Sequence, residues 1–83
     1  MIRVRVRYFA SIREALGAEE SVQTHAATVG ELRRVLISTS QAHARVLGLA
    51  QPLRMALDQV MCDEPAPLRD GAEVAFFPPV TGG

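Results

Sequence analysis

The residues with the clearest chemical potential end the chain, where Gly82 and Gly83 follow a segment stiffened by Pro78 and Pro79. Glycine has no Cβ, so this tail can enter a narrow channel and let another protein's backbone approach closely. Fully extended, residues 78–83 reach roughly 20 Å, at about 3.3 Å per residue. A terminal carboxylate is a poor electrophile, but adenylation by ATP would supply a leaving group that a sulfur nucleophile could displace. An inert, frayed chain end is the alternative.

Other reactive side chains form no recognisable catalytic or metal site. His25 and His43 lie far apart in the sequence, without the paired spacing of metal ligands, so we expect surface or structural roles. Cys62 is the single cysteine, which excludes an internal disulfide. No His or Lys stands near it in sequence to lower its pKa, so a buried, inert thiol is the expectation.

The charged clusters also have simple explanations. Asp63 and Glu64 are adjacent carboxylates in a turn-rich stretch, and solvation accounts for them without an active site. Arg3, Arg5 and Arg7 alternate with apolar residues, which predicts the solvent face of a strand that resists edge pairing. Binding of an anion by this stripe is the alternative.

The composition limits the architecture and the classes of function. The chain has 83 residues, 48% of them hydrophobic, which suits one compact core. Nine basic residues, all Arg, balance nine acidic ones, and a net charge of zero argues against general nucleic-acid binding. No apolar run has the length of a signal peptide core or a membrane span. We therefore expect a soluble, cytoplasmic protein that contacts neither nucleic acid nor membrane.

The amino-terminal half predicts a strand pair and a helix. Alternation over residues 2–8 predicts a strand with one buried face, and residues 11–16 predict a helical turn closed by Gly17. A second, antiparallel strand is expected over residues 21–25. Thr28 and Glu31 form a capping box, in which the Thr hydroxyl accepts the Glu31 N–H and the Glu side chain reaches back to Thr28. The predicted apolar face of the helix is Val29, Leu32, Val35 and Leu36, and the predicted polar face is Glu31, Arg33 and Arg34.

The carboxyl-terminal half predicts three more strands. The main helix should end near residues 38–40, and residues 41–50 fit either an irregular helix or a loop. Two short strands are expected within residues 54–62, around Asp58-Gln59, before a turn-rich stretch. The last strand covers residues 72–77 and stops at the prolines, which cannot donate ladder hydrogen bonds. This order predicts a small α+β roll, with a domain over residues 1–77 and an extended, flexible tail over residues 78–83.

Three segments of this sequence resemble the small, sulfur-carrier subunits of molybdopterin synthase (the MoaD type). They are the opening IRV…YFA…RE over residues 2–14, the PLRDG stretch at residues 67–71 and the ending EVAFFPPVTGG at residues 73–83. The resemblance spans the chain in order and length. Asp58-Gln59 departs from it, because an Asn-Gln or Asn-Gly pair is usual there. The resemblance implies a ubiquitin-like β-grasp fold, with a mixed five-stranded sheet and one main helix packed on one face.

The resemblance also implies a mechanism centred on Gly83. An adenylating partner that resembles ubiquitin-activating enzymes would consume ATP to form an acyl-adenylate on Gly83, and a sulfurtransferase relay would replace AMP with sulfur. The thiocarboxylate would then donate sulfur to cyclic pyranopterin monophosphate inside the large synthase subunit. The chain would bind no cofactor or metal and would be no enzyme on its own, but the sulfur donor of a heterotetramer.

Docking to this partner is expected beside the tail. Strand parity places Phe77 on the face opposite Val74 and Phe76, where Phe9 and Met61 are expected to join it. The resemblance implies apolar docking residues at these positions; burial of all three in the core is the alternative. The tail expected to enter the partner is Pro78, Pro79, Val80, Thr81 and Gly82.

Other functions share the same chemistry at Gly83. One is a β-grasp sulfur carrier for thiamine synthesis or tRNA thiolation, although the Phe-Phe-Pro-Pro-Val-Thr segment favours the pterin pathway. Another is a ubiquitin-like protein modifier, in which the activated carboxylate acylates a lysine. A pure interaction module with an inert tail belongs to a different class, because it would form no adenylate with ATP and a cognate activating enzyme.

Overall fold

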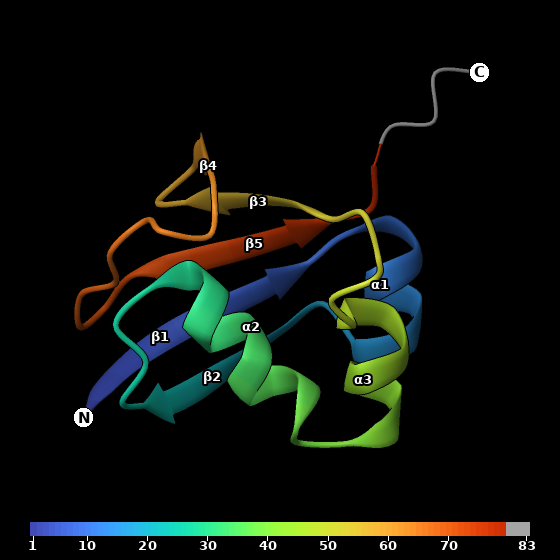
Figure 1. Cartoon of the computed structure of the whole chain (residues 1–83), viewed down its shortest axis with the longest axis horizontal. Helices are drawn as coiled ribbons and strands as arrows, with labels where there is room; N and C mark the ends of the chain where they lie inside the picture. The colour runs from blue at the N-terminus through green and yellow to red at the C-terminus, as the bar shows by residue number, and fades with distance from the viewer. Residues whose placement is uncertain (80–83) are drawn as a thin grey trace.

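The computed structural model describes residues 1–79 and consists of one sheet with helices on one side (Figure 1). The elements in chain order are β1 (Ile2–Tyr8), α1 (Ala10–Leu16), β2 (Glu19–Thr24), α2 (Val29–Ile37), α3 (Gln41–Leu47), β3 (Arg54–Leu57), β4 (Val60–Cys62) and β5 (Glu73–Phe77). The predicted α+β roll is confirmed, and the predicted main helix, α2, is accompanied by two shorter helices. No helix of the described part is long and apolar enough to cross a membrane.

The five strands form one mixed sheet in the order β2-β1-β5-β3-β4. β1 runs parallel to β5, and the other neighbours are antiparallel. The first strand thus pairs with the last, which places β5 between β1 and β3. The segment that follows Phe77 therefore leaves from the middle of the sheet, and β2 and β4 form its edges.

Alternation along β1 separates the two faces of the sheet. Val4, Val6 and Tyr8 are buried on the helix side, whereas Arg3 and Arg5 are exposed on the other. The core between sheet and helices also includes residues from every helix. Its remaining large members are Ile12, Val29, Leu32, Leu36, Leu47, Met55, Val74 and Phe76. One face of the sheet therefore holds the fold together, while the opposite face carries no helix (Figure 1).

The short amino-terminal elements agree with the sequence apart from their ends. α1 stops at Leu16 because Gly17 adopts φ 93°, a conformation that glycine tolerates without strain, and its N–H bonds the Arg13 carbonyl. β2 begins at Glu19, earlier than predicted, because the register with β1 continues to the Arg7–Glu19 pair. The predicted antiparallel pairing is confirmed.

The predicted capping box of α2 is confirmed, and it includes one further contact. The Thr28 hydroxyl accepts the Glu31 N–H at 3.2 Å, as expected. The Glu31 carboxylate reaches back to Thr28, whose hydroxyl donates to Oε2 at 3.5 Å, and its Oε1 also accepts the N–H of Ala27 at 3.2 Å. A cap of this kind typically contributes about 1 kcal/mol. The carbonyls of Ala66 and Glu64 accept the next two helix N–H groups, which ties α2 to the loop before β5.

The predicted polar face of α2 is wrong at Arg33, and the predicted apolar face is wrong at Val35. Arg33 is only 3% exposed, whereas Val35 is 37% exposed. Arg33 Nε donates to the Leu47 carbonyl at 2.7 Å, and Nη2 donates to the carbonyls of Gly48 and Gln51 at 2.6 and 2.9 Å. These carbonyls lie at and beyond the end of α3, so one guanidinium closes that helix and the loop after it.

The segment left open by the sequence becomes α3 and this loop. Ser40 caps α3 by accepting the His43 N–H at 3.1 Å. Downstream, Asp58 and Gln59 join β3 to β4 with φ angles of 49° and 70°. Two successive positive angles are typical of the tight hairpin turns whose twist matches the strands. The two predicted short strands are confirmed. Both residues of the turn between them adopt the left-handed backbone conformation, although neither is glycine.

Candidate functional site

The chain leaves the sheet where β5 ends at Phe77, as predicted. Pro78 and Pro79 follow and are half-buried. Neither can donate a backbone hydrogen bond, so pairing with β1 and β3 cannot continue. The residues expected to carry the chemistry, Val80, Thr81, Gly82 and Gly83, lie outside the described residues. What the structure does describe is the surface from which they depart.

Two aromatic rings stack on the open face of the sheet beside this departure point. Phe9 and Phe77 have ring centroids 4.7 Å apart and planes 12° from parallel. The Arg7 guanidinium carbon lies 5.3 Å from the centroid of the Phe9 ring, within cation–π range. Phe76, by contrast, is fully buried on the helix side. The parity argument that turned Phe77 away from the core is therefore confirmed, while its role in docking stays a prediction.

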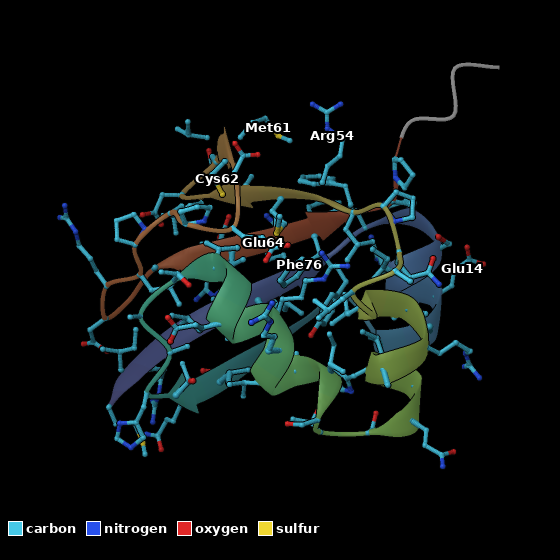
Figure 2. The ribbon with its side chains drawn as sticks, viewed as in Figure 1. Glu14, Arg54, Met61, Cys62, Glu64 and Phe76 are labelled. Atoms are coloured by element: carbon cyan, nitrogen blue, oxygen red, sulfur yellow. The ribbon has the colours of Figure 1, made fainter. Side chains whose placement is uncertain are left out.

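Met61 extends this apolar surface across the sheet. Met61 is 53% exposed and pairs with Ala56 of β3, which in turn pairs with Ala75 of β5. The two alanines leave room between the larger side chains. Figure 2 shows Arg54 and Met61 projecting away from the helices, on the side opposite Phe76. The predicted trio of Phe9, Met61 and Phe77 thus gathers around one groove of about 520 Å³.

We call this surface the docking face and define it by the residues that line the groove. They are Phe9, Ala10, Arg54, Met61, Phe77, Pro78 and Pro79. Sequence spacing alone does not predict Arg54 or Ala10 at this surface. Register could have found Arg54, because it pairs with Phe77 across β3 and β5 and so shares its face. The docking face is continuous with the prolines that begin the tail.

Cys62 borders the docking face without belonging to it. The thiol packs against the core from the helix side and is half-buried, and it lines a second hollow with Arg54, Met61 and Pro79. Burial raises the pKa of Cys62, and the Asp63 carboxylate raises it further. A thiol of raised pKa is a weaker nucleophile near neutral pH, which supports the inert role expected from the sequence.

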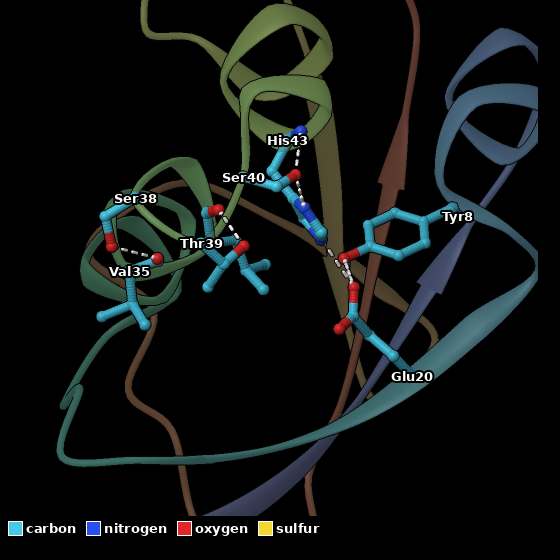
Figure 3. A network of polar contacts seen from close by, with 8 residues as sticks. Tyr8, Glu20, Val35, Ser38, Thr39, Ser40 and His43 are labelled. Atoms are coloured by element: carbon cyan, nitrogen blue, oxygen red, sulfur yellow. Dashed lines mark hydrogen bonds and ion pairs between the residues drawn. The ribbon is translucent and has the colours of Figure 1, made fainter.

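The histidines separate into one exposed and one structural residue, and neither belongs to a metal site within residues 1–79. His25 is exposed. His43 Nε2 lies 2.8 Å from Glu20 Oε2, and its Nδ1 lies 2.7 Å from the Ser40 hydroxyl (Figure 3). The Tyr8 hydroxyl donates to the same Glu20 oxygen at 2.6 Å. This network joins β1, β2 and the start of α3 at the opposite side of the sheet from the docking face.

Burial and hydrogen bonding shift the pKa values of two members of this network, Tyr8 and Glu20. Burial raises the pKa of Tyr8, and its hydrogen bond to Glu20 adds to the rise. Burial alone would also raise the pKa of Glu20, but the hydrogen bonds from His43 and Tyr8 together outweigh it and hold that pKa below its ordinary value. Sequence spacing gives no sign of this cluster, because its members come from three separate elements. Its groups are satisfied by one another, so we assign it to stability.

The order of elements, the parallel pairing of the first and last strands and the helices packed on one face of the sheet define a ubiquitin-like β-grasp domain. Solved structures agree. SAMP1 from Haloferax volcanii has a TM-score of 0.79 and 26% identity, with 98% of this chain and 99% of that chain covered. A complex of subunits 1 and 2 of molybdopterin-converting factor from Helicobacter pylori contains a chain with a TM-score of 0.70 and 30% identity, with 99% and 100% covered.

Sequence comparison identifies the family within this fold class. The ThiS family model matches residues 6–83. A molybdopterin synthase sulfur carrier subunit of Escherichia coli is 40% identical over 81 residues, which cover 96% of this chain and 99% of that protein. The chain belongs to the ThiS family, and the resemblance to the sulfur-carrier subunits of molybdopterin synthase is confirmed.

Proposed function

We propose that this chain is the sulfur-carrying subunit of a molybdopterin synthase. The observation that carries the proposal is the 40% identity, over nearly the whole of both chains, to a protein of that name from Escherichia coli. The complex of subunits 1 and 2 from Helicobacter pylori supports a large-subunit partner, since its similar chain is 30% identical to this one. The chain would supply no catalytic side chain of its own.

The proposed chemistry takes place at the Gly83 carboxylate. An adenylating enzyme would transfer AMP from ATP to this carboxylate and release pyrophosphate. A sulfur nucleophile delivered by a sulfurtransferase would displace AMP and leave a thiocarboxylate. The large subunit would then bind the loaded tail and transfer its sulfur to cyclic pyranopterin monophosphate, and the carboxylate would be regenerated. Two transfers would complete the dithiolene of one pterin.

Two features of residues 1–79 support these steps: the position where β5 ends and the apolar surface around it. The rigid strand β5 ends at Pro78 and Pro79, so the tail starts from a fixed point in the middle of the sheet. The docking face surrounds that point with apolar side chains. A partner that covers this face would therefore receive the tail in a defined position, which is what transfer between two active sites requires.

Mass spectrometry of the intact chain tests the chemistry. With ATP, the activating enzyme and a sulfur donor, replacement of one oxygen of the Gly83 carboxylate by sulfur should raise the mass of the chain by about 16 Da. The carboxylate itself is otherwise ionised at neutral pH. Deletion of Gly83, or addition of residues after it, should abolish this gain while circular dichroism stays unchanged. An unmodified wild-type chain in the presence of every cognate component would overturn the proposal.

A second candidate is a protein modifier, favoured by the likeness to SAMP1, the small archaeal modifier protein 1. In this case the activated Gly83 would acylate a lysine of another protein, with loss of AMP. The same experiment distinguishes the two candidates. A modifier would yield amide-linked adducts that resist thiols, whereas a sulfur carrier would yield the thiocarboxylate.

A further inference from the structure

One charged side chain interrupts the docking face. Every residue that lines its groove is apolar except Arg54. Arg54 is exposed and begins β3 directly across from Phe77. It also borders the second hollow, as do Met61 and Pro79. Arg54 therefore lines both hollows, as does Pro79, which leads into the tail. Figure 2 shows the Arg54 side chain projecting away from the helices.

The other arginines that line the middle of the open face have partners within the chain. Arg5 pairs with Glu19 at 3.4 Å. Arg7 pairs with Glu73 at 3.9 Å and covers the Phe9 ring. None of the ion pairs formed within residues 1–79 includes Arg54. Its guanidinium is thus available to a group from outside these residues.

An apolar partner surface laid on the docking face would bury this guanidinium. A buried charge without a partner is strongly unfavourable, so a stable complex must offer Arg54 a charged acceptor. The planar guanidinium matches a carboxylate with two parallel hydrogen bonds. Arginine is also among the residues that most often dominate binding at interfaces. The chemistry of the groove thus specifies its partner: an apolar surface that carries one well-placed carboxylate.

We propose that Arg54 is a specificity-determining contact that pairs with an acidic side chain of the large synthase subunit, at the centre of an otherwise apolar interface. The large subunit is chosen because a similar chain occurs in a solved complex of both subunits, and because Pro78 and Pro79, which lead into the tail, line the same groove. This inference rests on the proposed function and identifies the partner surface within it.

Titration calorimetry with the large subunit tests the pairing. Arg54→Glu should weaken binding at least roughly 30-fold, and Arg54→Gln about 10-fold, because each leaves the partner's carboxylate buried without its cation. The matched control is Arg3→Glu, which makes the same charge change on the same face at the far end of β1 and should change affinity less than about twofold. Increasing salt should weaken wild-type binding more than that of Arg54→Gln. Circular dichroism should show all variants folded.

The remaining outcomes each decide the question. Equal losses for Arg54→Glu and Arg3→Glu, or no loss for either, would overturn the specific pairing while the wild type still transfers sulfur. A loss confined to the activating enzyme would assign Arg54 to that partner instead. If the loss of affinity disappears when the wild type and the Arg54 variant are both truncated after Pro79, Arg54 would be assigned to the chain's own tail. A wild type that neither binds the large subunit nor transfers sulfur would overturn the proposed function itself.

Discussion

At the scale of single residues, Arg33 shows how one side chain can complete a distant element. It stands on α2, yet its hydrogen bonds satisfy carbonyl groups at the end of α3 and in the loop beyond. The last carbonyls of a helix lack partners within the helix, and a buried helix end needs them from elsewhere. Burial lowers the pKa of Arg33, an effect that Glu64 opposes from 3.6 Å. The guanidinium is thus a structural cation, unlike Arg54.

Arg33→Met should destabilise the domain by roughly 2–4 kcal/mol, since the apolar replacement fills space but leaves buried carbonyls without donors. Urea unfolding followed by circular dichroism measures the loss. Arg34→Met is the matched control on the next, exposed position of α2 and should change stability by less than about 0.5 kcal/mol. Similar midpoints for the two variants would contradict the role given to Arg33.

The Glu20 network predicts how stability depends on pH. The folded pKa of Glu20 lies below its ordinary value, so the folded state binds this proton more weakly than the unfolded chain does. The resulting stabilisation is fully present above the unfolded pKa of about 4.3 and is lost as pH falls through the lowered folded pKa. Urea unfolding below pH 5 should therefore show a decline in stability that Glu20→Gln reduces.

Tyr8→Phe provides the control for this assignment, because it keeps the ring in the core and removes only the hydroxyl. It should weaken one of the hydrogen bonds that lower the Glu20 pKa and so shift the acid decline toward higher pH. Identical pH profiles for wild type, Glu20→Gln and Tyr8→Phe would contradict the network's contribution. Other carboxylates would then account for the whole of the acid response.

At the scale of elements, the sequence predicts the helices and strands whose start, end or buried face is decided by nearby residues. The alternation of β1, the capping box of α2 and the prolines after β5 each act within a few residues, and each was confirmed. The sequence of α3 fits either a helix or a loop, because its Ser40 cap is local but its end depends on Arg33. The burial of Arg33 could not be predicted from helical spacing, since the carbonyls that accept from it lie beyond the next helix.

Locality also decides which part of the docking face the sequence predicts. The parity of one strand, which the sequence contains in full, predicts the orientation of Phe77. Arg54 required the pairing of β3 with β5, a long-range choice of register that no single segment specifies. The core was predictable to the extent that periodicity decides it, and the site only where one element decides it.

The hairpin turn of β3 and β4 offers an element-scale test. Gln59 holds φ 70°, where a side chain is unfavourable and glycine is not. Gln59→Gly should stabilise the domain by about 0.5 kcal/mol, the relief of this strain being partly offset by the greater freedom of glycine in the unfolded chain. Thermal unfolding would show a small rise in Tm. Gln23→Gly makes the same change within β2 and should lower it.

At the scale of the whole molecule, the proposed function assigns stability and recognition to opposite faces of the sheet. The helices cover one face, where the large apolar side chains are buried (Figure 1). The other face presents arginines along β1 and the docking face beside the tail. Successive side chains of a strand point to opposite faces, so Phe76 of β5 lies in the core and Phe77 lies on the docking face. A change on one face should then leave the other largely unaffected.

Phe76 and Phe77 test this separation at adjacent positions. Phe76 is fully buried among the helices, so Phe76→Ala should cost about 3–5 kcal/mol of stability, whereas Phe76→Leu should cost far less and leave affinity for the large subunit unchanged. Phe77→Ala should lose about 1 kcal/mol with the Phe9 stack yet weaken binding at least roughly 10-fold, since aromatic anchors dominate interfaces. Urea unfolding and calorimetric titration measure the two effects separately. If Phe77→Ala binds like the wild type while Phe76→Leu does not, recognition runs through the core, and the two-faced account of the sheet is wrong.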